Sequence, residues 1–256
     1  MEDREVYSLY FTGTGTSRTY ADAVAGELGE AKSVDLTPKD LPMELGMGAV
    51  AVFAAPVFGG RIPAAAVRRI RALAGNGAAA VALAVYGNRA YEDALLELKD
   101  LLEEQGFRVV AAAALVAQHS MAPTLAAGRP DEADLKAARE FGREVAAKLA
   151  AMPQREENAA LQVPGDRTYR LYNGVPFHPS AGKNCVRCGL CAQECPVGAI
   201  PAAAPERTDE KRCISCMRCV AVCPQRARAL GTLQEKAVTL KLAKACAERK
   251  APELFL

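Results

Sequence analysis

The chain contains no tryptophan, and only two of its 256 residues are histidines. It also lacks a long apolar run, because the longest, near residues 109–117, is about half the length that a membrane-spanning helix needs. The first four residues, Met-Glu-Asp-Arg, do not resemble the start of a secretory signal peptide. We therefore expect a cytoplasmic protein with no membrane segment.

Cysteine, by contrast, is abundant and concentrated. Eight of the nine cysteines form two runs, and each run reads Cys-x2-Cys-x2-Cys-x3-Cys-Pro. This spacing is typical of paired [4Fe–4S] clusters, in which the fourth cysteine of each run binds the other cluster. We predict two clusters. The first would be held by Cys185, Cys188, Cys191 and Cys223, and the second by Cys213, Cys216, Cys219 and Cys195.

Two alternatives fit this pattern less well. A disulfide framework is typical of small secreted domains, and zinc sites favour two separated cysteine pairs. Residues 181–230 resemble the bacterial two-cluster ferredoxins, and the similarity extends past the cysteines, since CPVGAI at 195–200 is echoed by CPQRARAL at 223–230. The resemblance implies a small α+β ferredoxin domain.

The charge distribution is consistent with bound clusters. Lys and Arg counted against Asp and Glu give −4 for residues 1–150, zero for 151–180, +4 for 181–230 and +2 for 231–256. Each oxidised cluster with its four thiolates carries about −2. Two clusters would neutralise the basic cysteine segment, so we expect no nucleic-acid partner.

The first 150 residues alternate between apolar strands and helices. Strand patterns lie at 6–11, 31–35, 49–55, 78–85 and 109–116, and helical patterns at 18–28, 63–73, 91–105 and 130–151. Apolar strands separated by helices predict a parallel sheet covered on both faces. We predict an α/β fold, namely a doubly wound, flavodoxin-like five-stranded parallel sheet of order 2-1-3-4-5, with its ligand at the switch point between strands 1 and 3.

The first strand is followed by a loop of glycines and hydroxyl residues. Its residues are Thr12, Gly13, Thr14, Gly15, Thr16 and Ser17. The loop is neither a G-x-G-x-x-G fingerprint nor a P-loop. Backbone N–H groups at a helix N-terminus favour phosphate, and hydroxyls without a lysine suit the phosphomonoester of FMN. The alternative is a simple Ser/Thr-rich helix cap.

Two later loops lie at the same edge of the predicted sheet. They contain Pro56, Val57, Phe58, Gly59 and Gly60, followed by Arg61, and Tyr86, Gly87, Asn88, Arg89, Ala90 and Tyr91. Together with the hydroxyl loop they make residues 5–150 resemble the flavodoxins. The resemblance implies FMN, with Thr12, Thr14, Thr16 and Ser17 on the phosphate. Phe58, Gly59 and Gly60 would then lie near flavin N5, and Tyr86, Gly87 and Asn88 near the pyrimidine edge. Tyr86 or Tyr91 would stack in place of the tryptophan that flavodoxins often use.

Catalytic candidates are few. His119 follows the fifth strand, and Arg61 and Arg89 lie in the two flavin loops. Each has an ordinary alternative, because a loop histidine is often a hydrogen-bonded structural residue and a loop arginine is often a solvated charge. The chain also lacks an acid–base constellation and a fingerprint for NAD(P)H.

We divide the chain into four segments. These are an FMN-binding domain at 1–152, an irregular packed linker at 153–180, a ferredoxin domain at 181–230 and a helical tail at 231–256. We expect a basic amphipathic helix at 234–250, and we expect Cys246, outside both runs, to be buried as a small apolar residue.

The complete arrangement resembles a family of flavodoxin–ferredoxin fusion proteins. Gly174-Val175-Pro176-Phe177 before the first cysteine, and the GGR and YGNRAY loops, carry this resemblance. It implies electron transfer between two [4Fe–4S] clusters and FMN, with a redox protein as partner. The alternative is an FMN-dependent reductase of a small molecule, in which the clusters supply electrons to the flavin. A redox sensor is a third option, but the chain has no output module.

Overall fold

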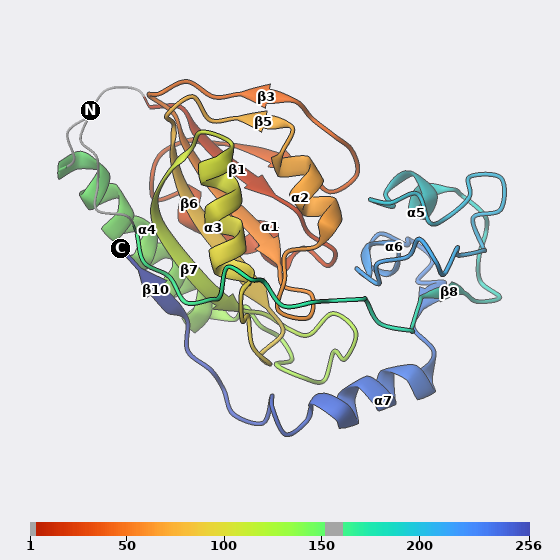
Figure 1. The fold of residues 1–256 in the computed structure, drawn as a ribbon. Coiled ribbons are helices and arrows are strands. Elements are labelled where there is room, and N and C mark those ends of the chain that lie inside the picture. The colour runs from red at the N-terminus through yellow and green to blue at the C-terminus, as the bar shows by residue number, and fades with distance from the viewer. Residues whose placement is uncertain (1–3, 152–160) are drawn as a thin grey trace.

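The computed structural model describes residues 4–151 and 161–256. A six-stranded sheet of order β10-β7-β6-β4-β1-β2 forms the centre of the first part (Figure 1). Its strands are β1 (Val6–Tyr10), β2 (Ala31–Asp35), β4 (Val50–Pro56), β6 (Ala79–Tyr86), β7 (Arg108–Val116) and β10 (Glu253–Phe255). Omitting β10, the strands are parallel in the predicted order 2-1-3-4-5, so the flavodoxin-like fold is confirmed. The sequence did not predict β10, which adds antiparallel to β7.

Helices cover both faces of the sheet. On one face α1 (Thr16–Ala25) and α4 (Glu132–Ala151) bury Tyr20 and Phe141, and on the other α2 (Ala64–Ile70) and α3 (Ala94–Glu104) bury Leu95 and Leu98. Alanine and valine fill β4, β6 and β7 because these strands are covered on both sides. A second sheet of two strands, β3 (Met43–Glu44) and β5 (Leu73–Ala74), belongs to the same part of the chain, which we call the α/β domain.

The cysteine segment forms a small module beside the α/β domain (Figure 1). It contains α5 (Leu190–Gln193), α6 (Arg218–Ala221) and the antiparallel pair β8 (Ser180–Ala181) and β9 (Arg228–Ala229). Both helices begin after a left-handed residue, Gly189 and Met217, at equivalent places in the two cysteine runs. The internal repeat seen in the sequence is therefore also a repeat of backbone conformation.

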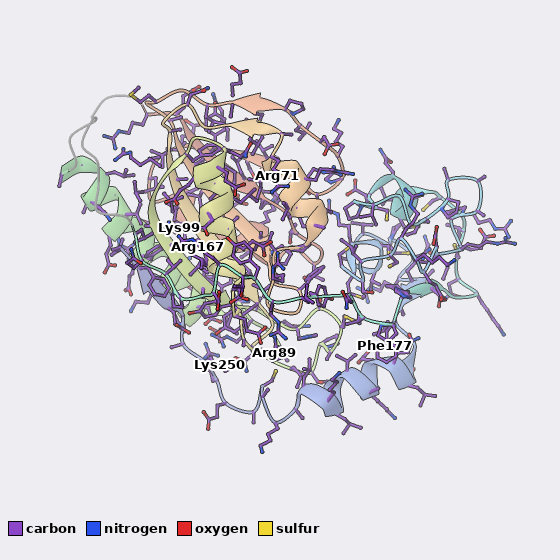
Figure 2. All side chains as sticks on the ribbon, viewed as in Figure 1. Arg71, Arg89, Lys99, Arg167, Phe177 and Lys250 are labelled. Atoms are coloured by element: carbon purple, nitrogen blue, oxygen red, sulfur yellow. The ribbon has the colours of Figure 1, made fainter. Side chains whose placement is uncertain are left out.

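The linker and the tail return to the α/β domain. Residues 153–160 of the predicted linker lie outside the described residues. Arg167, labelled in Figure 2, and Tyr169 both bind Asp100 of α3. In the tail, α7 (Thr232–Leu242) ends eight residues before the predicted end at 250. The predicted extent of this helix was therefore wrong. Its Leu233 and Leu240 are 83% and 79% exposed. Cys246 is buried as expected, and no helix in the described residues is long and apolar enough to cross a membrane.

Candidate functional site

The hydroxyl loop between β1 and α1 is held by its own side chains and by a neighbour. The Thr12 N–H donates to Thr37 Oγ1 at 2.8 Å, and Thr12 Oγ1 accepts the Gly15 N–H at 2.9 Å. Gly15 has φ +94°, a left-handed conformation that glycine adopts without strain, and α1 begins at the next residue. The backbone N–H groups of the first helical turn are thereby presented toward the carboxyl edge of the sheet.

Ser17 is the most informative residue of this loop. Its side chain is fully buried, yet its hydroxyl has no hydrogen-bond partner among the described residues. An unpaired buried hydroxyl costs free energy, so such a group is expected to meet a partner supplied from outside the chain. A phosphate oxygen at the N-terminus of α1 is a chemically suitable partner. The residues present therefore fit a bound phosphate group.

The loops that follow β1, β4, β6 and β7 meet around one pocket, which we call the phosphate-loop pocket. Ten residues predicted from the sequence line it: Thr12, Gly13, Thr14, Thr16, Ser17, Pro56, Val57, Phe58, Tyr86 and Gly87. His119 lines it too. Val85, Ala117, Gln118, Ser120 and Cys216 also line it but were not among the predicted cofactor residues, although residues 118–121 were expected at this edge of the sheet. The first four of these end β6 or follow β7, so the strand order alone would have suggested them.

Gly15 does not line this pocket, and four other predicted flavin residues, Gly59, Gly60, Asn88 and Tyr91, lie outside it and contact the linker or the tail. A Cβ on Gly59 would lie 2.2 Å from the Tyr172 ring, and one on Gly60 would lie 2.8 Å from the Arg170 side chain. The Asn88 amide donates to the carbonyls of Cys246 and Glu248, and Tyr91 donates to Glu253 at 2.6 Å. Tyr91 still packs on Tyr86, with ring centroids 5.5 Å apart.

The two arginine candidates are engaged in ion pairs. Arg61 binds Glu97 through two hydrogen bonds of 2.8 and 2.7 Å, and Arg89 pairs with Glu92 of its own loop. The Lys250 ammonium of the tail also donates to the Arg89 carbonyl (Figure 2). Both arginines thus shape the loops that border the pocket.

His119 lies against the backbone of Gly87, where a Cβ would come within 2.6 Å of the imidazole. Burial, assisted by the positive charge of Arg89, lowers the pKa of His119 to about 4. The imidazole is therefore neutral at pH 7. Since its Nδ1 accepts the Met121 N–H at 3.3 Å, the ring proton is on Nε2. His119 can donate one hydrogen bond into the pocket without carrying a charge.

The eight motif cysteines surround two separate cavities, in the sets expected from the spacing. Cage 1 is lined by Cys185, Cys188, Cys191 and Cys223, and cage 2 by Cys195, Cys213, Cys216 and Cys219. Each run sends its fourth cysteine to the other cage. Within the described part of the chain, no three His, Cys, Asp or Glu side chains are close enough to hold a single metal ion. Four thiols around a cavity fit a multi-iron cluster better than a zinc ion.

Backbone and charge at the cages also suit bound clusters. At equivalent positions of the two runs, Ala199 donates its N–H to Cys195 Sγ and Ala227 donates to Cys223 Sγ, both at 3.2 Å. Burial raises the pKa of Cys216 to about 12 and that of Cys219 to about 11. Iron binding would replace these thiol protons. The buried Arg228 guanidinium lies 3.8 Å from Cys191 Sγ and offers a counter-charge.

Cage 2 lies directly against the phosphate-loop pocket. Cys216 lines both cavities, and a Cβ on Gly13 would lie only 1.9 Å from the Cys216 carbonyl oxygen. This contact between the two parts of the chain requires a glycine at position 13.

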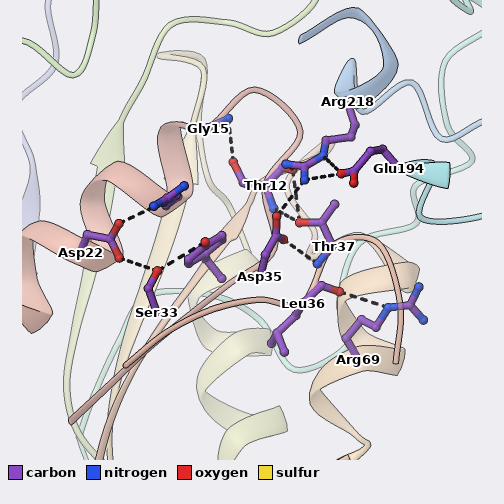
Figure 3. Close-up of polar contacts among 12 residues, drawn as sticks. Thr12, Gly15, Asp22, Ser33, Asp35, Leu36, Thr37, Arg69, Glu194 and Arg218 are labelled. Carbon is purple, nitrogen blue, oxygen red and sulfur yellow. Dashed lines mark hydrogen bonds and ion pairs between the residues drawn. The ribbon is translucent and has the colours of Figure 1, made fainter. Parts of the chain in front are cut away.

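Two arginines join the module to the α/β domain (Figure 3). Arg218 pairs with Asp35 at 2.8 Å and with Glu194 at 2.5 Å. Arg69, whose side chain is 3% exposed, donates to the Leu36 carbonyl at 3.1 Å and to the Pro196 carbonyl at 3.1 Å. Cage 2 is thus fixed beside the pocket by charged groups from both sides of the junction.

Comparison with known proteins gives one family match and several similar structures. Residues 184–229 match the 4Fe-4S dicluster domain family. No curated protein matches the chain in sequence. Among solved structures, a flavodoxin from the domain Archaea is 12% identical with a TM-score of 0.38, covering 57% of this chain and 99% of its own. The Streptococcus pneumonia TIGR4 flavodoxin is 17% identical with a TM-score of 0.40, covering 56% and 98%.

A NAD(P)H:quinone oxidoreductase from Methanothermobacter marburgensis is also similar to part of the chain. It is 18% identical, with a TM-score of 0.34, and the match covers 55% of this chain and 95% of that one. The fold assignment of the α/β domain rests on the strand order of its sheet.

Proposed function

We propose that this chain is an electron-transfer protein that relays electrons between two [4Fe–4S] clusters and a bound FMN. The observation that carries the proposal is the position of Cys216, which lines cage 2 and the phosphate-loop pocket at once. When bound, the clusters supply one-electron transfer, and the flavin supplies transfer of one or two electrons. A fixed junction between the two sites replaces a diffusional encounter.

The cysteines of cage 1 and cage 2 differ in exposure, so one cluster site is closer to solvent than the other. At cage 1, Cys188 is exposed and the neighbouring Val186 side chain is 63% exposed. At cage 2, Cys216 and Cys219 are buried. We propose that an external redox protein docks at cage 1. Lys183, Arg187 and Arg226 near cage 1 favour an acidic face on that partner.

The second candidate function is an FMN-dependent reductase of a small molecule. It is favoured by a second cavity that touches both Phe58 of the phosphate-loop pocket and Cys213 of cage 2. Neutral His119 beside the pocket could donate a hydrogen bond to flavin or substrate. Among residues 4–151 and 161–256 we identify no acid–base set beside it, so the relay remains the preferred function.

Anaerobic reduction of the purified protein tests the relay. Iron and acid-labile sulfide should each approach about eight per chain, and bound flavin about one. Substoichiometric reductant should first bleach the cluster absorption and then reduce the flavin within the same molecule. Reduced clusters beside a flavin that stays oxidised would exclude the relay, and far fewer irons would exclude the two-cluster assignment.

A further inference from the structure

A cleft of about 860 Å³ lies where α2 and α3 face the linker and the second cysteine run. This cavity, which we call the interdomain cleft, is distinct from the phosphate-loop pocket and from both cages. It adjoins the phosphate-loop pocket and cage 2. Phe58 lines the cleft and the pocket, and Cys213 lines the cleft and cage 2. A molecule in the interdomain cleft would therefore lie next to both redox sites.

Three aromatic side chains line the cleft: Phe58, Tyr169 and Tyr172. All three are half-buried, so each presents part of its ring to the cleft. Tyr169 is fixed by a 2.7 Å hydrogen bond from its hydroxyl to Asp100, and the Tyr172 ring is fixed by close contact with Gly59. These walls are preorganised for a flat apolar body, since little side-chain entropy remains to be lost on binding.

Inside the cleft the charges cancel. Arg61 and Glu97 form a bidentate pair whose side chains are 24% and 10% exposed. Arg61 Nη1 also donates to the Arg170 carbonyl at 2.7 Å, and the guanidinium lies 5.0 Å from the Tyr169 ring centre. The interior therefore offers apolar surface without an unpaired charge.

The rim of the cleft is positively charged. Arg68 and Arg71 on the α2 side and Lys211 and Arg212 on the cysteine side are all exposed. Two of these arginines have acidic neighbours. Arg71 lies 3.8 Å from Glu104, and Arg68 lies 3.5 Å from Asp40. Both ion pairs are long and solvent-exposed. Exposed pairs of this kind are weak and exchange readily for another anion. Figure 2 shows Arg71 near α2.

We propose that the interdomain cleft binds an aromatic organic anion. The ring system packs between Phe58, Tyr169 and Tyr172, and a carboxylate, sulfonate or phosphate group binds the arginines at the rim. Arginine is suited to this role because its planar guanidinium binds oxyanions through two hydrogen bonds. The site is independent of the proposed relay, and its test needs no electron transfer.

Two fluorescent probes of the same shape test the proposal on the full chain with its cofactors bound. 8-Anilinonaphthalene-1-sulfonate carries an anionic group, and N-phenyl-1-naphthylamine has the same rings without it. The Arg68→Ala/Arg71→Ala variant should bind the sulfonate about tenfold more weakly and the neutral probe within about twofold of the original affinity. Arg139→Ala/Arg143→Ala on α4, where each arginine has an acidic partner, is the matched control and should change neither.

A variant whose cleft is filled by a larger side chain tests where the probes bind. Val67 is a half-buried α2 residue in the cleft wall, and Val67→Trp should fill the space and abolish binding of both probes. Unchanged flavin and cluster absorption shows that each variant is folded. The proposal is overturned if the sulfonate does not bind at about 1 mM, if the Val67→Trp variant still binds it, or if the α2 variant weakens both probes equally.

Discussion

A single buried hydroxyl connects the α/β domain to its proposed cofactor. Ser17 has no partner of its own in the described part of the chain, so a ligand phosphate would supply the hydrogen bond. We expect Ser17→Ala to raise the dissociation constant of FMN about tenfold, because a hydrogen bond to a charged group is worth about 1.5–3 kcal/mol. The apoprotein should keep its free energy of unfolding. Fluorescence titration of the apoprotein with FMN measures the change.

Thr19→Val is the control for this prediction. Thr19 lies on the same helix, but its hydroxyl is exposed and donates to the Gly15 carbonyl at 3.2 Å. Its replacement should leave FMN affinity within about twofold, since no buried donor is lost. Equal losses in both variants would show that the helix, and not the Ser17 hydroxyl, determines the affinity.

His119 makes the stability depend on pH. Its pKa is about 4 in the folded chain, against an ordinary value of about 6.5. Between these two pKa values His119 binds a proton in the unfolded chain but not in the folded chain. The free energy of unfolding therefore falls as the pH falls from about 6.5 to about 4. After a discount for partial exposure, we expect a loss of about 2 kcal/mol.

Chemical denaturation across this pH range measures the effect of His119. His119→Gln should show a smaller loss between about pH 6.5 and pH 4, and the difference between the two proteins isolates His119 from the carboxylates. Parallel pH profiles for the two proteins would rule out the proposed burial of a neutral imidazole.

At the residue scale, the sequence predicted contacts set by a repeated motif better than contacts between segments that share no motif. The cysteine sets followed from spacing alone, because a cubane dictates where its four sulfurs lie. Gly59 and Asn88 looked like flavin residues, but the linker contacts one and the tail contacts the other. No local pattern reveals that a segment more than a hundred residues away will contact a loop.

At the scale of elements, the junction between α6 and the hydroxyl loop has a specific anchor in Arg218. Its side chain is 15% exposed and pairs with Asp35 and Glu194. We expect Arg218→Gln to weaken the junction by about 2 kcal/mol, since two partly buried carboxylates lose their partner. Amide hydrogen exchange should become faster in residues 12–17 and around Cys216. Arg207→Gln, an exposed arginine of the same module, should leave exchange there unchanged.

The edge strand β10 is tied to the sheet by a side chain as well as by its backbone. Tyr91 donates to Glu253 at 2.6 Å, and β10 pairs with Ala112, Ala113 and Ala114 of β7. Tyr91→Phe should therefore cost about 1.5 kcal/mol and speed hydrogen exchange of β10. Tyr7→Phe removes an exposed hydroxyl that donates to Glu5 at 3.2 Å, and should cost less than about 0.5 kcal/mol. Equal costs would contradict the assigned role of Tyr91.

Strands and helices with strong periodicity were predictable, and the tail was not. The five parallel strands are continuous apolar runs, and their order follows from the doubly wound pattern. β10 has only three residues, and its sequence resembles any short apolar segment. A helix was predicted over 234–250, but α7 ends at Leu242. The residues after it bind Asn88 and then pair with β7. Tertiary contacts outweighed helix propensity there.

At the scale of the molecule, the cavities form a continuous series. Cage 1 opens to solvent, cage 2 lies between cage 1 and the α/β domain, and cage 2 shares Cys216 with the phosphate-loop pocket. Cys191 and Cys219, one from each cage, pack together around Ile200. The chain therefore brings each site into contact with the next.

This series predicts different consequences for two cysteine substitutions. Cys188→Ala at the exposed cage should lower iron from about eight to about four per chain and leave FMN affinity unchanged, because Cys188 does not line the pocket. Cys216→Ala should lower iron similarly but also weaken FMN binding, since Cys216 forms part of the pocket wall and contacts Gly13. Iron analysis and flavin titration on the same anaerobic samples make the comparison. If Cys188→Ala weakened FMN binding as much as Cys216→Ala, contact of Cys216 with the pocket wall would not explain the loss, and the proposed order of the relay would be overturned.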